Sequence, residues 1–460
     1  MSREMMEQRE QSNACINSAE SRKNKSEAQM RHSGIEWIGE IPKEWNLKRA
    51  KHLFAQRNSK GNESAVLLSA TQKQGMMPQS LLEGVVQVNN NTDLQTFKTV
   101  HINDYVISLR SFQGGFEKSN YEGVCSPAYQ VFYNITPIDH NYYWLLFKSY
   151  GFVDKINSLT VGIREGKNIQ YKDFANMILA VPPLSEQHKI ANYLDKVCGE
   201  VDEMIALQEL MIEELKAYKQ SVITEAVTKG LNPNTPMKDS GIDWIGEIPE
   251  HWKIVPIKHI KSKEPNAFVD GPFGSNLKSE HFIENGDVLV VESGFITTGK
   301  FIFKEFKTIS KEHFETIKRS QCKAKDIIIA KIGANYGMAG ELPDLDKPSV
   351  VSGNSLKITL DNSKMLNTIF VNAMICAKNN CGFIGMVQEN AQPALSLSGL
   401  NNFKLPVAPI EEQQSIASYL DTKCAEIDAL IAIKQAKIEE LKDYKKSVIY
   451  EYVTGKKEVV

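Results

Sequence analysis

Four loops in this sequence combine glycine with cationic or amide side chains. Two follow strand-like runs over 104–110 and 326–331 and read Ser111-Phe112-Gln113-Gly114-Gly115 and Ile332-Gly333-Ala334-Asn335-Tyr336-Gly337. The others are Gly162-Ile163-Arg164-Glu165-Gly166-Lys167-Asn168 and Asp270-Gly271-Pro272-Phe273-Gly274-Ser275-Asn276-Leu277-Lys278. Glycine lets backbone approach a ligand, and Arg, Lys, Gln and Asn can contact base edges or phosphates. One such loop is more often a plain turn, so only their joint occurrence favours nucleic-acid contact.

Motifs for catalysis are missing from the sequence. Residues 162–168 lack the G-x-x-x-x-G-K-[ST] spacing of an ATP-binding phosphate loop. The carboxylates of Asp344 and Asp346 are too crowded to lie on paired strands around a catalytic metal, so a surface loop is the favoured interpretation. We find neither the Asn/Asp-Pro-Pro-Tyr/Phe motif nor the strand-linked G-x-G loop of an adenine methyltransferase. We therefore expect no catalytic residue in this chain.

The cysteines and histidines form no pattern typical of a metal site or a disulfide framework. The nine histidines show no H-E-x-x-H spacing, and the seven cysteines include no C-x-x-C pair. We expect no metal site, and we expect free thiols at Cys15, Cys125, Cys198, Cys322, Cys376, Cys381 and Cys424.

No apolar run approaches the roughly 18 residues of a membrane helix, and the N-terminus is polar, so the prediction is a cytoplasmic protein without membrane contact.

Charge is distributed unevenly along the 460 residues. The formal net charge of -2 is unfavourable for phosphate contact, which needs concentrated positive charge. However, 251–340 holds 14 Lys and Arg against 10 Asp and Glu, whereas 186–228 holds 4 against 9. The acidic excess therefore lies partly outside the loop-bearing segments, which leaves those segments freer to bind an anion.

Much of the sequence occurs twice. The pattern S-G-I-[ED]-W-I-G-E-I-P-x-x-W occupies 33–45 and 240–252, at an offset of 207 residues. Two further patterns, P-x-x-E-Q-x-x-I-A-x-Y-L-D from 183 and 409 and E-L-K-x-Y-K-x-S-V-I from 214 and 440, recur at an offset of 226. Because the offset changes from 207 to 226 residues, insertions must lie between the matched patterns, in 46–182 and 253–408. The sequences of these two segments otherwise look unrelated. Similar flanking segments around dissimilar central segments indicate that the flanking segments perform the same role twice, while the central segments meet two different targets. A duplication with drifted cores is the alternative, but drift would erode all segments similarly.

The second and third repeats predict two long helices. Apolar residues recur at alternating steps of four and three, which is typical of a coiled-coil seam, and Gly230 stands where a left-handed C-cap belongs. We predict that the helices pair with each other in antiparallel fashion, and the alternative is that each packs only on its own domain. The predicted seam comprises Ile190, Leu194, Val201, Leu215, Tyr218 and Val222 with Ile416, Leu420, Ile427, Leu441, Tyr444 and Val448.

The repeats divide the chain into six segments. The first is rich in Ser, Asn, Gln, Glu and Lys without apolar periodicity, which predicts disorder. The predicted segments are a disordered extension at 1–32, a first recognition domain at 33–183, a helix at 184–230, a second recognition domain at 231–409, a helix at 410–455 and a tail at 456–460.

With these motifs the chain resembles the specificity subunit of a type I restriction-modification enzyme. The likeness is carried by 35–42 and its second copy, by the P-x-x-E-Q-x-x-I-A-x-Y-L-D entry into each helix, and by 270–275. It spans residue 33 to the C-terminus. The extension before residue 33 departs from the family's usual start, which lies near the first I-P pair.

The resemblance implies an α+β fold, in which two α/β target-recognition domains are joined by an antiparallel coiled coil of the two long helices. Each domain would read one half of a split, asymmetric site in double-stranded DNA, while the helices fix the gap and dock two modification subunits. Those subunits use S-adenosylmethionine to methylate adenine, and restriction subunits use ATP and Mg to translocate and cut DNA. This chain itself would hold no cofactor.

The resemblance also points to the residues that would face DNA. It implies that the loops 108–115 and 271–278 contact DNA, and it extends this prediction to cations and polar residues elsewhere in the variable segments. The candidates are Ser108, Arg110, Ser111, Gln113, Gly114, Lys118, Arg164, Lys167, Gly271, Phe273, Gly274, Ser275, Lys278, Lys331, Asn335 and Tyr336.

Two other function classes remain as competing hypotheses. A coiled-coil scaffold whose globular ends bind proteins would also explain the repeats, and salt dependence would distinguish it, because phosphate-anchored complexes weaken steeply as salt rises. A self-sufficient nuclease or methyltransferase is disfavoured by the missing motifs. The sequence predicts neither the bases that are read nor the gap between half-sites, since readout depends on side-chain placement and DNA deformability.

Overall fold

The chain folds into two compact units, each containing part of both long helices. The computed structural model describes residues 29–61, 65–72, 74–82, 94–108, 115–159, 169–386 and 393–459. Unit 1 comprises Met1–Glu209 together with Ala436–Val460, and unit 2 comprises Leu210–Gln435. Unit 1 is therefore built from two separate stretches of chain, whereas unit 2 is built from one.

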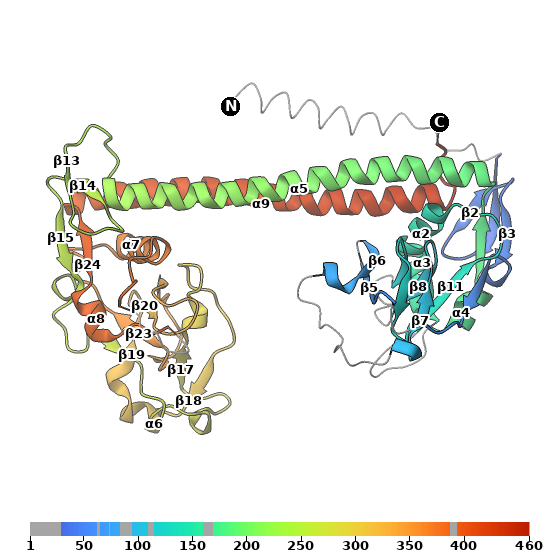
Figure 1. Ribbon diagram of the computed structural model, residues 1–460. Helices are drawn as coiled ribbons and strands as arrows, with labels where there is room; N and C mark the ends of the chain where they lie inside the picture. Colours follow the sequence, from blue (N-terminus) through green and yellow to red (C-terminus); the bar gives the residue numbers. More distant parts are fainter. Residues whose placement is uncertain are drawn as a thin grey trace. The chain divides into compact units, whose positions relative to one another are not determined.

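Unit 1 places short strands before its helices (Figure 1). Its strands are β1 Met30–Ile35, β2 Gly39–Pro42, β3 Asn46–Arg49, β4 Phe54–Arg57, β5 Leu68–Thr71, β6 Gly75–Pro78, β7 Lys98–Val100, β8 Tyr105–Ile107, β9 Phe116–Lys118, β10 Gly123–Cys125, β11 Gln130–Asn134 and β12 Ile178–Val181. Its helices are α2 His140–Lys148, α3 Tyr150–Ser158, α4 Tyr171–Asn176, the first part of α5 Leu184–Lys229 and the last part of α9 Ile410–Val453.

Unit 2 also combines short strands with helices. The strands are β13 Met237–Asp239, β14 Glu247–Pro249, β15 Lys253–Pro256, β16 Phe268–Asp270, β17 Val288–Val291, β18 Lys307–Ile309, β19 Gln321–Cys322, β20 Ile327–Ala330, β21 Ala339–Glu341, β22 Ser349–Val351, β23 Ser355–Ile358 and β24 Lys404–Val407. The helices are the last part of α5, α6 Lys311–Thr316, α7 Asn367–Asn379, α8 Leu397–Asn402 and the first part of α9.

The two variable segments share one sheet topology although their sequences look unrelated. Unit 1 contains an antiparallel sheet of order β4-β11-β8-β9, and unit 2 contains an antiparallel sheet of order β16-β23-β20-β21. In both, the chain visits the four strands in the same sequence, with a hairpin between the second and third. Unit 2 adds a sheet of order β18-β17-β22-β19, whose central pair is parallel. Together with the long helices this is the predicted α+β fold.

An equivalent pair of strands closes each variable segment. β3 pairs with β12 so that Asn46 faces Val181, and β15 pairs with β24 so that Lys253 faces Val407. These residues lie at the predicted boundaries between constant and variable sequence. A variable segment therefore leaves and rejoins the constant part of its unit at one place, through two hydrogen-bonded strands.

The constant tryptophans tie each unit to the start of a long helix. The indole Nε1 of Trp45 donates to Glu186 Oε2 at 2.9 Å, and that of Trp252 donates to Glu412 Oε2 at 3.0 Å. Both tryptophans are buried, and a buried indole N–H needs an acceptor. The recurrence of Trp and Glu at two different offsets therefore has one cause, because the two residues form a bonded pair in each unit.

The glutamine beside each glutamate fixes the entry into the helix. Gln187 is 2% exposed, donates to the carbonyl of Pro182 at 2.9 Å and accepts from the backbone N–H of Asp139 at 2.9 Å. Gln413, fully buried, does the same with Ala408 and Leu366, at 2.8 and 2.9 Å. Buried polar groups are costly unless hydrogen-bonded, so these amides select one path of the chain into each helix.

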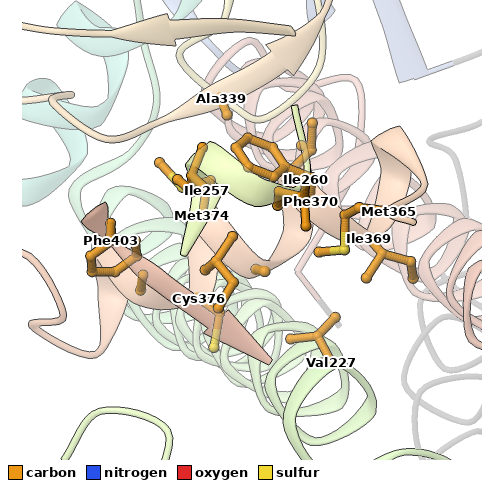
Figure 2. Packing of buried hydrophobic residues seen from close by; sticks show 14 of the residues in the cluster. Val227, Ile257, Ile260, Ala339, Met365, Ile369, Phe370, Met374, Cys376 and Phe403 are labelled. Carbon is orange, nitrogen blue, oxygen red and sulfur yellow. The ribbon is translucent and has the colours of Figure 1, made fainter. Parts of the chain in front are cut away.

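Each unit has its own hydrophobic core, which includes turns from both long helices. In unit 1 an aromatic cluster around Phe54, Phe132 and Phe147 continues onto Leu194 of α5 and Val453 of α9. In unit 2 the core is mainly aliphatic and is completed by the end of α5 and the start of α9. Figure 2 shows Val227 of α5 facing residues of α7 such as Met374 and Cys376.

The long helices pair in antiparallel fashion within each unit, as predicted. In unit 1, Lys445 Nζ of α9 lies 2.7 Å from Asp202 Oδ2 of α5. In unit 2, Lys219 Nζ of α5 lies 2.6 Å from Asp428 Oδ1 of α9. Each residue of the first pair is related to one of the second by the 226-residue offset. The alternative, in which each helix packs only on its own domain, is wrong.

The predicted seam is correct at most positions but wrong at its two tyrosines. Tyr218 and Tyr444 are 53% and 37% exposed, whereas Ile212 and Ile438 are 6% and 7% exposed and take part in the buried stripe. At Ile212 and Ile438 the buried residue lies one position after the one that the spacing predicts, whereas Val201 and Val222 are buried as predicted. Periodicity does not separate the two choices, because both positions carry apolar residues, as at Met211 and Ile212. At the tyrosines, the next residue is the lysine of an interhelical ion pair.

The predicted disordered extension is too long by at least three residues. β1 begins at Met30 and pairs with β2, and the Arg31 guanidinium donates to the carbonyl of Trp45 at 2.7 Å. Lys238, the equivalent residue in unit 2, donates to the carbonyl of Trp252 at 2.7 Å. These contacts stabilise the strand. Because they join residues that are distant in the sequence, the composition of the segment does not reveal them. Residues 1–28 lie outside the described part of the chain.

Candidate nucleic-acid interface

The two loops that follow the strand-like runs occupy equivalent places in the two units. Residues 108–115 connect β8 to β9, and residues 331–338 connect β20 to β21. Each run begins with a buried aspartate, Asp104 or Asp326, whose carboxylate accepts from the backbone N–H three residues earlier at 2.9 Å. The residue before each aspartate has a φ of 69°. The same turn therefore starts the same hairpin in both units.

Several candidates in unit 1 lie outside the described residues. Arg110, Ser111, Gln113 and Gly114 fall within 109–114, and Arg164 and Lys167 fall within 160–168. Ser108 is described and is only 5% exposed, with its N–H donating to the carbonyl of Gly115 at 2.8 Å. Ser108 therefore closes the base of the hairpin instead of presenting its side chain on the surface.

Lys118, at the end of β9, points to α2. Its Nζ donates to Asn141 Oδ1 at 2.7 Å and lies 5.9 Å from the ring centroid of Trp144. Burial lowers the pKa of Lys118, and Asp139 and Asp195 oppose this shift. Lys118 thus belongs to a half-buried polar cluster behind the hairpin.

The same cluster contains a buried carboxylate. Glu117 is 2% exposed and its Oε1 lies 2.5 Å from Lys148 Nζ. Burial raises the pKa of Glu117 to about 7, despite the opposing effect of Lys148. The carboxylate therefore changes charge near neutral pH, directly beside the β8–β9 hairpin.

Glu117→Gln is expected to flatten the pH dependence of unit 1 stability between pH 5 and 7. Because the folded pKa is raised above the usual 4.5, folded unit 1 binds more protons than the unfolded chain in this window, and its stability falls as pH rises. The slope reaches about 1.4 kcal/mol per pH unit. Burial lowers the pKa of His140, which gives the opposite trend, so the variant must be compared with the wild type at each pH.

Urea unfolding at pH 5, 6, 7 and 8 measures this difference, with the unfolding of unit 1 monitored by hydrogen exchange in β8, β9 and α2. Glu122→Gln is the matched control, because the Glu122 side chain is 70% exposed. Parallel pH profiles for wild type and Glu117→Gln would contradict the prediction.

Unit 2 brings several candidates together around one cleft. A cleft of about 550 Å³ is lined by five of them: Gly271, Phe273, Gly274, Lys278 and Lys331. It also includes residues that sequence reasoning missed, namely Phe282, Glu292, Lys307 and Asn354. No sequence motif marks these four, because they come from four separate parts of the chain and only the fold gathers them.

Asp270 organises the cations beside this cleft. Its carboxylate accepts from Arg319 Nη2 at 2.9 Å, and its Oδ2 lies 3.6 Å from Lys331 Nζ. Arg319 lies in a short 3-10 helix, Lys318–Ser320, while Lys331 follows β20. Charge-assisted contacts of this kind fix the direction of a cation. Arg319 was not predicted, since it lies outside every glycine-containing loop.

The remaining candidates of unit 2 lie away from the cleft lining. Ser275 and Asn335 are exposed, and Tyr336 is half-buried against the core, with Lys378 Nζ 3.2 Å from its ring centroid. The structure therefore separates Asn335 and Tyr336 from Phe273, although all three come from predicted contact loops.

Within the described ranges, the structure has no group of three or more His, Cys, Asp or Glu residues placed to hold a metal ion. In the same residues, no helix combines the length and apolar character needed to cross a membrane. The described cysteines, Cys125, Cys198, Cys322, Cys376, Cys381 and Cys424, are all free thiols, as predicted.

Comparison with known proteins gives one consistent family. A family model described as a type I restriction modification DNA specificity domain matches residues 42–217 and 273–443. The type I restriction enzyme MjaVIII specificity subunit of Methanocaldococcus jannaschii is 26% identical over 293 residues, covering 63% of this chain and 64% of the relative. The EcoBI specificity subunit of Escherichia coli is 24% identical over 288 residues, covering 61% and 58%. The match thus spans less than two thirds of either relative.

Solved structures share the fold. A chain from a study of complex assembly and conformational transition in the type I R-M system has a TM-score of 0.67 at 12% identity, covering 90% of this chain and 98% of that one. The HsdS subunit from Thermoanaerobacter tengcongensis has a TM-score of 0.51 at 13% identity, covering 92% and 99%.

Proposed function

The chain belongs to the type I restriction-modification DNA specificity family, and from this we propose that it binds a bipartite DNA site for such a complex, with one half-site read by each unit. It would contribute DNA recognition and no reaction of its own. The curated relatives are named as specificity subunits, which agrees with the absence of catalytic motifs in this sequence.

One observation carries the proposal: a single sheet topology supports two different sets of loops. The hairpins β8–β9 and β20–β21 occupy the same position in sheets of the same strand order, yet their loop sequences differ. A structural role alone would favour similar residues in both hairpins. An asymmetric, two-part DNA site requires two different sets of base-contacting residues, and two units with one sheet topology but different loops can supply them.

The constant elements support the proposed partners. The long helices carry exposed apolar side chains, including Leu207, Leu210 and Ile433, which are 46%, 56% and 65% exposed. We propose that constant surfaces of this kind dock two modification subunits, which would carry S-adenosylmethionine, and that restriction subunits using ATP and Mg join this core. This chain would hold no cofactor itself.

Exchange of residues 46–182 for those of a relative with another specificity is expected to change only one half of the methylated site. The exchange replaces β3 and β12 together, so their pairing is kept within the inserted segment. The chimaera is assembled with modification subunits, and methylated adenines are mapped in genomic DNA. Exchange of 253–408, which replaces β15 and β24 together, is the matched control and should change the other half. A change in both halves, or in neither, would contradict the proposal.

The protein-binding scaffold is the second candidate, and salt separates it from DNA recognition. A complex anchored on several phosphates loses about 10³- to 10⁵-fold in affinity between 50 and 200 mM salt. Binding to a DNA duplex that is weak and insensitive to salt would favour the scaffold.

A further inference from the structure

Phe273 holds its ring in solvent at the rim of the unit 2 cleft. It is 68% exposed, although an aromatic ring is normally among the most buried side chains. Resting on the proposed DNA-reading function, we propose that Phe273 is a wedge that enters one base-pair step of the half-site read by unit 2 and unstacks it.

The loop that carries Phe273 is anchored at its start. The N–H of Gly271 donates to the carbonyl of Ser355 at 3.0 Å, and a Cβ at Gly271 would lie 1.9 Å from the backbone oxygen of Ser352. Only glycine allows this approach. Pro272 follows and restricts the backbone further. The position from which Phe273 projects is therefore fixed.

The loop is also anchored at its far end. The carbonyl of Asn276 lies 2.9 Å from His313 Nε2, and the N–H of Lys278 donates to His281 Nδ1 at 3.0 Å. The two imidazole rings stack with centroids 3.9 Å apart. At the tip, by contrast, a Cβ at Gly274 would meet no atom within 4 Å. The loop that carries Phe273 is therefore held at both ends, while its tip has open space around it.

A cation lies beside the exposed ring, and a second one lines the same cleft. Lys331 Nζ lies 5.9 Å from the Phe273 ring centroid and is oriented by Asp270, and Lys278 lies at the end of the same loop. An exposed ring with an ammonium group beside it fits a polyanion whose interior is apolar, which describes the stacked bases of DNA between phosphates. DNA-bending proteins insert phenylalanine between base steps in this way.

A scan with 2-aminopurine tests the wedge. The full chain is assembled with modification subunits and bound to duplexes carrying the probe at successive positions of the unit 2 half-site. A fluorescence rise is expected at one step, lost in Phe273→Ala and retained in Phe273→Trp. Methyltransferases also extrude their target base, so a signal at the methylated adenine that persists in Phe273→Ala belongs to the modification subunit.

Affinity gives a second, independent measurement. Phe273→Ala is expected to weaken specific binding about tenfold to a hundredfold with an unchanged salt slope, because stacking is lost and phosphate contact is kept. Lys331→Ala should reduce the salt slope by about one. A mismatch placed at the wedged step should restore much of the affinity that Phe273→Ala loses, since the base-pair step is then already unstacked. Phe303→Ala removes a phenylalanine that is 66% exposed elsewhere in unit 2, and should have no effect.

The outcomes separate this inference from the proposed function. Specific binding by wild type and Phe273→Ala alike, with no probe signal that depends on Phe273, would overturn the wedge and leave the DNA-reading function intact. Absence of specific binding by the wild-type assembly would overturn both.

Discussion

Val453→Asp is expected to unfold unit 1 and leave unit 2 folded, although residue 453 lies more than 200 positions after Met1–Glu209, the first stretch of unit 1. Val453 is fully buried, and its carbonyl accepts from the Tyr142 hydroxyl at 2.9 Å. A buried charge without a partner adds a large desolvation cost to the lost apolar burial. We expect a loss of at least about 5 kcal/mol, comparable to the whole stability of a marginal domain.

The internal repeat supplies the matched experiment. Val227 is the equivalent residue by the 226-residue offset, is 2% exposed and belongs to the core of unit 2, so Val227→Asp should unfold unit 2 instead. Ser447→Asp and Ser221→Asp, at exposed positions of the same helices, should unfold neither. Hydrogen exchange resolved by mass spectrometry measures protection in residues 30–181 and 237–407 separately. Protection of unit 1 in Val453→Asp would contradict the prediction.

Lys357→Met is expected to destabilise unit 2 by about 3–5 kcal/mol, because it leaves a buried carboxylate without its cation. Asp326 is fully buried and Lys357 is 6% exposed, with Nζ 3.3 Å from Asp326 Oδ2. The Thr359 hydroxyl also donates to Asp326 Oδ1, at 2.5 Å. These two remaining donors, the hydroxyl and the backbone N–H of Lys323, satisfy the oxygens of Asp326 but do not neutralise its charge.

A double variant separates charge from packing. Asp326→Asn combined with Lys357→Met removes both charges and should recover part of the loss, measured as the free energy of urea unfolding. Lys323→Met is the control, since its ion pair with Glu264 is exposed and such pairs contribute about 1 kcal/mol or less. Equal destabilisation by the single and the double variant would contradict the role assigned to the charge.

The sequence predicted the elements whose pattern is local. The long helices follow from apolar periodicity and from a glycine at the expected C-cap, and Gly230 indeed has a φ of 76°. The strands after Asp104 and Asp326 follow from short β-branched and aromatic runs that begin at a polar residue. The Phe273 loop was singled out because glycine, proline and a cation occur together.

The sequence did not predict what depends on distant contacts. The shared strand order of the two variable segments is invisible in the sequence because different side chains fill the two cores: aromatic residues such as Phe54 and Phe132 in unit 1, and mainly aliphatic residues in unit 2. Whether Ile212 or Met211 is buried in the seam depends on the facing helix. Arg319 contacts Asp270, which is 49 residues away in the chain, and this pairing is not visible in the sequence.

The division of unit 1 into two stretches has a consequence for synthesis. Residues 436–453 are translated 227 residues after Glu209 (436 − 209), a delay of roughly 10–45 s at the usual 5–20 residues per second. Until then, the apolar faces that will contact Val448, Ile449 and Val453 remain exposed on the ribosome. Unit 2, made from one stretch, can mature first. The order of maturation is therefore opposite to the order of translation, and the earlier half needs protection from aggregation while it waits.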